Sequence, residues 1–347
     1  MTTMSEKADL APTGDRATLA LVASAAAVSM STVSKVLNGR TGVSDATRAR
    51  VEDLLQDHGY NRRGGSQAAS LIELVFSELD TSWAIEIIRG VEGVARENGM
   101  SVVLTESGDR HSPGPEWIEG VLQRRPAGVI LVFSDLSTDH KKQLRTRNIP
   151  FVVVDPAGDP APDVPSVGSA NWAGGVLATR HLIELGHTDI AVISGPDDMM
   201  CSRARVSGFR SAMDAAGIPV QEDIIYTGNF HREDGVRRGL EMLSRPTPPT
   251  AVFAGSDLQA LGVYEAARSL GFKVPDDLSI VGYDDLQIAQ WAGPPLTTVR
   301  QPLIEMAQQA AQLVLRLRNG IHSGSMRVDL ATSLVVRSST ATPASRA

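Results

Sequence analysis

The segment Val28–Asn38, VSMSTVSKVLN, restricts the fold and function of this chain more than any other stretch. Ser29 is a favourable N-cap because its hydroxyl can accept a free N–H of the first helical turn. Val33, Val36 and Leu37 then fall on one face of a helix. The other face carries short hydroxyl side chains and one lysine. The segment therefore predicts a short amphipathic helix with an unusual polar face.

A second short helix is expected upstream, over residues 19 to 25, with only residues 26 to 28 between the two. This spacing is typical of a helix-turn-helix unit, in which the second helix lies in the DNA major groove. The pattern alone fits equally well an ordinary amphipathic helix in a small helical bundle. The rest of the chain has to decide between them.

The charge is distributed unevenly along the chain. Residues 16 to 63 hold seven Lys or Arg against four Asp or Glu, a net charge of +3, whereas the whole chain carries −7. The remaining residues therefore carry −10, which argues against nucleic-acid binding over the whole surface. A small basic head on a large acidic body suits a DNA-binding module attached to a different domain.

Length and composition favour a multidomain globular protein. With 347 residues and 42% hydrophobic residues, the chain has enough material for two or three sizeable cores. Residues 1–15 have the composition of a disordered tail and lack the apolar region of a signal peptide. No later apolar run approaches the ~20 residues of a membrane span. The single cysteine, Cys201, excludes an intrachain disulfide and a cysteine-rich metal site, so we expect a cytoplasmic protein without a metal.

Residues 16–61 are expected to form an all-α head. Ser44 can cap a third helix, whose apolar residues would close a three-helix core. Residues 62–70 follow as a linker that places Arg62 and Arg63 beside two glycines. This composition indicates a mobile segment that faces DNA.

From residue 71 short apolar strands alternate with helical segments up to about residue 338. The expected strands are 71–76, 101–106, 128–133, 151–155, 190–195, 251–257 and 278–285. Near-continuous apolar runs of this length indicate strands covered on both faces, and therefore parallel, doubly wound sheets. About ten strands are too many for one small sheet, so two similar lobes are expected.

Polar residues follow several of these strands, and in parallel sheets ligands bind at the carboxyl ends of strands. Three tryptophans lie in or just after strand-to-helix loops. Apolar faces beside carboxylates and hydroxyls suit a sugar, whose ring has an apolar C–H face and a rim of hydroxyls. The residues are Ser77, Asp80, Asp155, Ser256, Asp257, Asp284, Asp285, Trp83, Trp172 and Trp291. Two readings stay open: Asp257 and Asp285 can instead cap helices, and Trp291 can instead pack between lobes or subunits.

The motifs resemble those of LacI/GalR-type transcriptional regulators from about Thr18 to Arg337. They are VSMSTVSKVLNG, VSDATRARV, RHLIELGHTDIAVISG, RARVSGF, AVFAGSDLQALGVYEAARSLGFKVPDDLSIVGYDD and PPLTTVRQP, in the order of the family. The resemblance implies a homodimeric repressor with a periplasmic-binding-protein-like sensor whose effector changes operator affinity. It implies one lobe from residues 71–167 and 300–325 and another from residues 168–298 and 327–338, with a tail over residues 339–347.

The resemblance assigns three residues to base reading on the helix 28–38, namely Met30, Ser31 and Lys35. Those at positions that hold phosphates in the family are Ser29, Thr32, Ser34, Asn38, Ser44, Thr47 and Tyr60. Phosphate contacts fix the register of a protein on DNA, and base contacts supply the specificity. Lys35 stands where the family often has arginine, so it can reach a guanine edge but lacks the planar fork.

In the sensor the resemblance assigns a donor, Arg205, and an acceptor, Asp284, to the ligand. Ser256, Phe230 and Asp155 match further cleft positions. We expect the effector to be a mono- or oligosaccharide and expect no cofactor. The resemblance leaves open whether it induces or co-represses.

Two departures from the family pattern stand out. Ala27 occupies a turn position that is usually glycine, and a left-handed conformation there costs alanine on the order of 1 kcal/mol. In the linker, Ala69 replaces a leucine that wedges into the minor groove, and Gly64 and Gly65 weaken a helix. We therefore expect a weaker hinge, for which Arg62 and Arg63 compensate by contacting DNA.

Two other classes of protein compete with a regulator. An enzyme on this architecture would need a phosphate loop, a nucleophile elbow or a metal cluster, and the sequence has no GxxxxGK[ST], GxSxG or HExxH. A periplasmic sugar-binding protein would share the sensor but would need a signal sequence and would lack the basic head. We expect a DNA-binding regulator that is not an enzyme.

Overall fold

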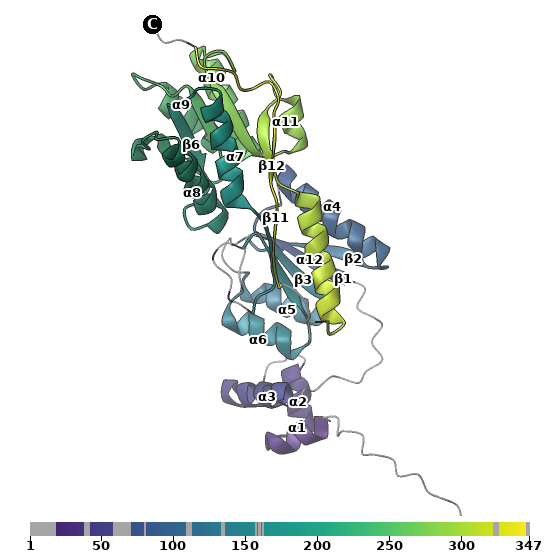
Figure 1. Cartoon of the computed structure of the whole chain (residues 1–347). Coiled ribbons are helices and arrows are strands. Elements are labelled where there is room, and N and C mark those ends of the chain that lie inside the picture. The colour runs from purple at the N-terminus through teal and green to yellow at the C-terminus, as the bar shows by residue number, and fades with distance from the viewer. Residues whose placement is uncertain are drawn as a thin grey trace, which may run out of the picture.

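The computed structural model describes a small helical head and two α/β lobes, arranged end to end in Figure 1. The described residues are 19–37, 42–57, 71–79, 81–108, 113–132, 136–156, 158, 161, 163–321 and 326–344. The predicted tail 1–15 and the linker 62–70, with its two glycines, lie outside them. No single helix in these ranges is long and apolar enough to span a membrane. Among the described residues, the first two helices of the head reach that length and apolar content only when taken together, and they are bent by 105° relative to each other.

The head contains the three predicted helices, α1 (Leu19–Ala25), α2 (Met30–Leu37) and α3 (Asp45–Asp57). Their apolar positions share one small core, which includes Val22, Val33 and Val51. The serine caps form as expected, because Ser29 Oγ accepts the Thr32 N–H at 3.1 Å and Ser44 Oγ accepts the Thr47 N–H at 3.4 Å. The hydrophobic pattern of the sequence thus accounts for this domain.

The turn between α1 and α2 has the conformation suspected from the sequence. Ala27 has φ of +52°, in the left-handed region that glycine adopts at least cost. The Ala27 and Val28 N–H groups donate to the Ser24 and Ala23 carbonyls, which fixes the turn. The head therefore holds an unfavourable alanine conformation so that α2 can leave α1 at this angle.

The first lobe is a six-stranded parallel sheet covered by two helices on each face. Its strand order is β11 (Arg327–Leu330), β5 (Ser166–Ser169), β4 (Phe151–Val154), β3 (Gly128–Val132), β1 (Leu71–Phe76) and β2 (Ser101–Glu106). One face packs on α4 (Ser82–Glu97) and α12 (Leu303–Arg318). The other face packs on α5 (Pro115–Arg124) and α6 (Thr138–Thr146). The strands are buried on both sides, as their near-continuous apolar sequences require.

The second lobe repeats this plan with an antiparallel edge strand. Its order is β12 (Ser333–Val335), β10 (Thr297–Arg300), β9 (Ser279–Asp284), β8 (Ala251–Ala254), β6 (Ile190–Ser194) and β7 (Ile225–Thr227), and β12 runs antiparallel to β10. The helices are α7 (Asn171–Glu184), α8 (Met200–Ala215), α9 (Arg232–Leu243), α10 (Asp257–Leu270) and α11 (Gln287–Trp291), with a 3₁₀ turn at Glu222–Ile224. Helices α7 and α8 pack on one face, and α9 and α10 on the other.

The chain crosses between lobes three times, and one crossing differs from the sequence expectation. The first crossing follows β5 and the second follows β10, close to the expected positions. The third was expected within residues 320–330, with the second lobe resuming at residue 327, but β11 still belongs to the first lobe because Arg327–Leu330 pair with Ser166–Ser169. The crossing therefore falls between β11 and β12.

The boundary of the predicted tail 339–347 is also corrected. Ser339 is fully buried. Its hydroxyl donates to the Ile280 carbonyl and accepts the Thr297 N–H, and its carbonyl accepts the Ile280 N–H. This residue therefore still belongs to the second lobe, since its hydroxyl and backbone complete hydrogen bonds of β9 and β10.

Candidate functional site

The polar face of α2 is open to solvent. The side chains of Met30, Ser31 and Lys35 are exposed, and Met30 is 56% exposed although it is apolar. Val33 and Val36 on the opposite face are buried in the head. The three predicted base-reading residues are therefore accessible on one α-helix, and a major groove admits an α-helix.

The hydroxyl residues predicted to hold phosphates gather at the starts of α2 and α3. Ser29 Oγ lies 2.7 Å from Ser31 Oγ and 2.9 Å from Thr32 Oγ1. Ser44 Oγ donates to Thr47 Oγ1 at 2.8 Å. Helix N-termini present free N–H groups and favour anions, so these two ends suit phosphate contacts. Ser34 is half-buried on α2, and Asn38, Tyr60, Arg62 and Arg63 lie outside the described residues.

A cavity of about 430 Å³ lies between the two lobes. It has a volume typical of small-molecule sites, which span about 300–1,000 Å³. Residues of both lobes line it: Phe76, Ser77, Glu78, Thr81, Trp83, Ala84, Gly108, Pro196, Met199, Arg205, Asn229, Phe230, His231, Ser256, Leu258, Asp284 and Leu286. Six of the predicted ligand-binding residues therefore meet at one cavity.

Arg205 is a fixed cation at this cavity, held by α8 and only 4% exposed. Its Nε donates to Asn171 Oδ1 at 2.8 Å and its Nη1 donates to the Gly255 carbonyl at 2.6 Å. The guanidinium carbon also lies 3.7 Å from the centre of the Tyr283 ring. Among the described residues Nη2 has no hydrogen-bond partner, so it remains a donor for a ligand.

Asp284 provides the complementary acceptor at the end of β9. Its Oδ1 accepts from Gln301 Nε2 at 2.6 Å, and a backbone hydrogen bond from Asp257 also favours the ionised carboxyl. Burial raises the pKa of Asp284 to about 7, even though Arg205 and the Gln301 hydrogen bond favour the ionised form. Burial therefore disfavours the ionised carboxyl, and a hydroxyl that donates to it would favour the charged form.

Ser256 and Phe230 are two further predicted residues at the cavity, with different roles. Ser256 caps α10, and its hydroxyl donates to the Phe230 carbonyl at 2.7 Å. Phe230 has φ of +67°. Ser256 thus stabilises an unfavourable backbone conformation that places the Phe230 ring at the cavity.

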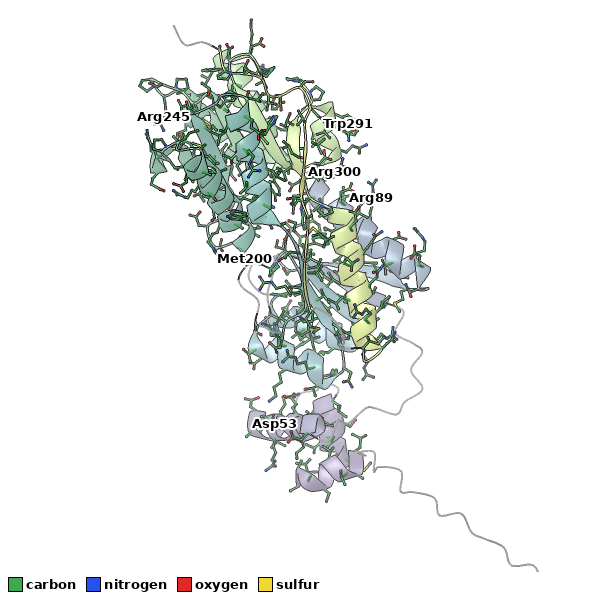
Figure 2. All side chains as sticks on the ribbon, in the orientation of Figure 1. Asp53, Arg89, Met200, Arg245, Trp291 and Arg300 are labelled. Carbon is green, nitrogen blue, oxygen red and sulfur yellow. The ribbon has the colours of Figure 1, made fainter. Side chains whose placement is uncertain are left out.

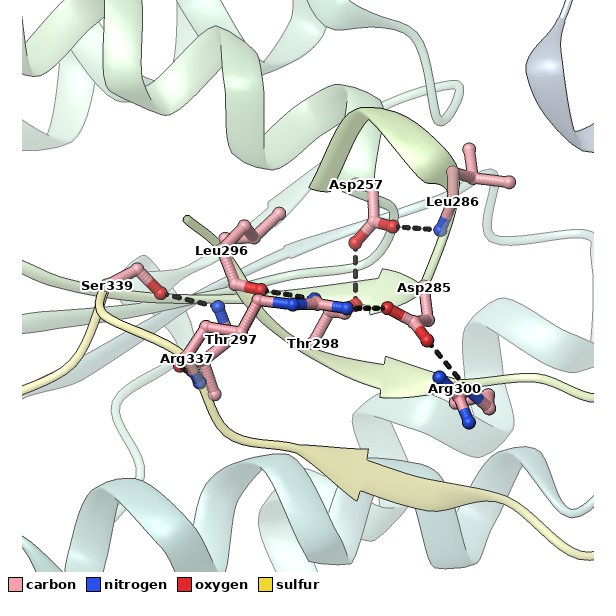
Figure 3. A network of polar contacts seen from close by, with 9 residues as sticks. All are labelled: Asp257, Asp285, Leu286, Leu296, Thr297, Thr298, Arg300, Arg337 and Ser339. Atoms are coloured by element: carbon pink, nitrogen blue, oxygen red, sulfur yellow. Dashed lines mark hydrogen bonds and ion pairs between the residues drawn. The ribbon is translucent and has the colours of Figure 1, made fainter. Parts of the chain in front are cut away.

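The neighbouring carboxylates Asp257 and Asp285 form a network that holds the chain around Asp284 (Figure 3). Asp257 accepts the Leu286 N–H at 2.7 Å and the Thr298 hydroxyl at 2.6 Å. Both Arg300 and Arg337 pair with the buried Asp285 carboxylate. Asp284 and Asp285 have φ of +117° and +59°, so these contacts hold two unfavourable conformations. Neither Asp257 nor Asp285 lines the cavity.

Three predicted ligand residues lie elsewhere. Trp291 is 70% exposed on α11 and is marked in Figure 2 at the surface of the second lobe. Trp172 is 49% exposed and lies in a shallow groove between α7 and α8. Asp155 is buried and does not line the cavity, and burial raises its pKa to about 6 although the nearby Arg205 cation opposes this. Position in a strand-to-helix loop could not show that the two tryptophan side chains lie away from the cavity.

Several residues at the cavity were not predicted. His231 Nε2 lies 3.5 Å from Glu78 Oε2, which joins the second lobe to the first across the cavity. Asn171 and Gln301 orient Arg205 and Asp284. No sequence signal marks the amides, but Glu78 follows directly on Ser77 at the end of a strand, which is the position that singled out the other site residues.

Comparison with known proteins agrees with this division of the chain. Residues 18–63 match the bacterial regulatory proteins, lacI family, and residues 179–340 match a periplasmic binding protein-like domain. The HTH-type transcriptional repressor CytR of Escherichia coli K12 is 34% identical over 93% of this chain and 96% of its own length. The HTH-type transcriptional regulator CelR of Thermobifida fusca is 35% identical over 93% of this chain and 98% of its own length.

Solved structures give the same result. A transcriptional regulator CelR–cellobiose complex has a TM-score of 0.70 at 35% identity and covers 93% of this chain and 100% of its own. A lac repressor dimer bound to operator and the anti-inducer ONPF has a TM-score of 0.68 at 28% identity, covering 94% and 100%. The chain therefore belongs to the lacI family of bacterial regulatory proteins and is a DNA-binding transcriptional regulator with a helix-turn-helix head and a two-lobed sensor.

Proposed function

We propose that this regulator is a homodimeric repressor of carbohydrate-utilisation genes whose operator affinity changes when a sugar binds between its lobes. The observation that carries the proposal is that the Arg205 guanidinium, a donor, and the Asp284 carboxyl, an acceptor, line one cavity beside aromatic rings. No cofactor enters this proposal. It assigns the protein to the cytoplasm, where it meets DNA.

The cavity combines the two surfaces that a sugar ring needs. Phe230, Trp83 and Phe76 line it with aromatic surface, on which the C–H face of a pyranose can stack. Arg205 donates to hydroxyl oxygens, and Asp284 accepts from hydroxyl hydrogens. Charge-assisted hydrogen bonds of this kind contribute about 1.5–3 kcal/mol each, enough to select hydroxyl patterns.

The comparisons support the same class of effector. The CelR structure, 35% identical, holds cellobiose, and a LacI family regulator from Enterococcus faecium, 28% identical with a TM-score of 0.71, holds ribose. Ser77 and Trp83 come from the first lobe, whereas Arg205, Phe230 and Asp284 come from the second. A sugar held by both groups would favour one relative position of the lobes, which is the differential affinity that an effector requires.

The proposed mode of DNA binding follows from the two heads of a homodimer, one from each subunit. The lac repressor relative is a dimer on its operator. Two copies of α2 with Met30, Ser31 and Lys35 outward would read two half-sites of a pseudo-palindrome about one helical turn or a multiple apart. A change in lobe position then alters operator affinity by changing the relative position of the two heads.

A thermal-shift screen of the full chain tests the effector. The panel contains pentoses, hexoses and disaccharides, with nucleosides as a counter-set. We expect at least one sugar to raise the melting temperature, because ligand binding stabilises the native state. The same sugar should change operator affinity in a mobility-shift titration and should be recovered unhydrolysed. A response to nucleosides alone contradicts the sugar assignment, and hydrolysis of the sugar contradicts the absence of catalysis.

A further inference from the structure

The head docks on the first lobe through α6, at a contact separate from the linker. In Figure 1 α2 and α3 lie directly below α5 and α6. Arg147, the residue after α6, donates from Nε to the Leu37 carbonyl at 2.9 Å and from Nη2 to the Val36 carbonyl at 3.0 Å. Val36 and Leu37 are the last two residues of α2. The first lobe therefore holds the recognition helix by its C-terminal end.

The contact fits the requirements of a helix end. The last carbonyls of an α-helix have no partner within the helix and carry partial negative charge, so a cation there is favourable. The planar guanidinium reaches two carbonyls at once, which fixes the direction of the helix axis as well as its position. Burial lowers the pKa of Arg147 and the nearby Glu52 carboxylate opposes this, and an arginine side chain remains a cation at neutral pH.

A second set of charges extends the contact along α3. Lys142 Nζ on α6 pairs with Asp53 Oδ1 at 2.8 Å, and Asp53 is marked on the head in Figure 2. Glu52 on the same helix is only 8% exposed. The docking surface is thus two cations of the first lobe, Arg147 and Lys142, against carbonyls and carboxylates of the head.

The docked arrangement leaves the reading face free. Met30, Ser31 and Lys35 are exposed. The contact with the first lobe is therefore compatible with DNA binding by the head. The contact is important in this chain because the linker sequence contains Gly64 and Gly65, which weaken a hinge helix.

We propose that Arg147 is a positioning residue for DNA recognition: it fixes the recognition helix relative to the first lobe, so that the sensor sets the direction in which each head meets the operator. This inference rests on the paired heads of the proposed function. Arg147 itself does not contact DNA. Its loss should therefore reduce specific binding and leave nonspecific binding unchanged.

The test uses the full chain and a duplex selected by the wild-type protein from a random-sequence library. Binding is measured to that duplex, to a scrambled duplex, and to duplexes with one or two base pairs added between the half-sites. For Arg147→Ala we expect affinity for the selected duplex to fall about tenfold, since two charge-assisted hydrogen bonds are lost. Discrimination against altered spacing should also fall, whereas the salt dependence of binding should stay the same.

Two variants complete the test. Arg147→Lys keeps the charge and should restore part of the affinity and of the spacing preference. Arg145→Ala is the matched control. Arg145 lies on α6, two residues before Arg147, and pairs with Asp163 of the first lobe, so this variant should behave as wild type. Thermal melting of all three confirms that the sensor is folded.

The outcomes separate this inference from the proposed function. Unchanged affinity and spacing preference in Arg147→Ala overturn the positioning role. A salt slope reduced by about one also overturns it, because Arg147 would then be a phosphate contact. If wild-type binding itself ignores spacing, the paired heads are wrong and the positioning role falls with them.

Discussion

Replacing Asp284 with asparagine should stabilise the ligand-free protein while weakening its ligand site. Asparagine keeps the size of the side chain and an oxygen that accepts from Gln301, but it removes the titratable group. Burial raises the pKa of Asp284 from its ordinary value of 3.8 to about 7, which means that ionisation is unfavourable in the folded chain. The wild-type carboxylate is therefore a cost to folding at neutral and higher pH.

The size and the pH window of this cost follow from linkage. The folded chain binds the Asp284 proton more tightly than the unfolded chain does, so stability falls as pH rises from about 4 to about 7 and is constant above that. A difference of about 3 units between the pKa in the folded chain and that in the unfolded chain corresponds to about 4 kcal/mol of stability, at about 1.36 kcal/mol per unit. Asp284→Asn should thus gain up to about 4 kcal/mol at about pH 8 and much less at about pH 5.

The assay is the melting temperature of both proteins across this pH range. Asp276→Asn, an exposed carboxyl on the loop before β9, is the matched control and should follow the wild type. The Asp284 variant should also bind the effector about tenfold or more weakly, because a neutral amide replaces a charged acceptor. A stability difference that does not depend on pH would refute the reasoning.

Four further variants test the other parts of the structure. Arg205→Ala should abolish the effector response while operator binding is retained; an operator-release titration that still shows release at normal effector concentrations contradicts the cleft assignment. Ala27→Gly should stabilise the head by about 0.5–1 kcal/mol, because relief of the left-handed strain exceeds the added unfolded-state entropy; amide exchange of the head measures this, and unchanged protection contradicts it. Arg337→Met should destabilise the second lobe by about 1–3 kcal/mol in urea, since it leaves Asp285 with one partner. Arg300→Met should destabilise the lobe less than Arg337→Met does, because the Arg300 side chain is 56% exposed. A larger loss of stability in Arg300→Met than in Arg337→Met would contradict the burial argument.

The surroundings of the same carboxyl also predict a pH effect on effector binding. A ligand hydroxyl that donates to Asp284 lowers its pKa, so binding releases protons and effector affinity should fall as pH drops below about 7. Isothermal titration in two buffers of different ionisation enthalpy measures the released protons. Asp284→Asn should remove this proton release, and its persistence would assign it to another group.

Local sequence was sufficient for the head and for the general plan of the sensor. The period of Val33 and Val36 defined α2, and the glycine position occupied by Ala27 marked the left-handed turn before the structure confirmed it. Both are local properties, because helix periodicity and turn conformation depend on residues a few positions apart. The short apolar runs gave the parallel strands for the same reason.

The tertiary structure decided which polar side chains form the cleft. Asp284 and Asp285 are adjacent in sequence, yet Asp284 lines the cavity while Asp285 pairs with Arg300 and Arg337. The partners of these carboxylates lie more than a dozen residues away in sequence, on a crossing strand and on the C-terminal segment. Sequence position gives the end of a strand, but the direction of a side chain depends on which distant segment packs against it.

The helix α2 (Met30–Leu37) shows the same division. Its amphipathic sequence determined that one face packs in the head and the other, with Ser31 and Lys35, meets solvent. Its fixation by Arg147, more than a hundred residues later, was decided only by folding. The physical reason is that the acceptors are backbone carbonyls at the end of α2, which every sequence possesses, and only the packed first lobe determines which cation reaches them.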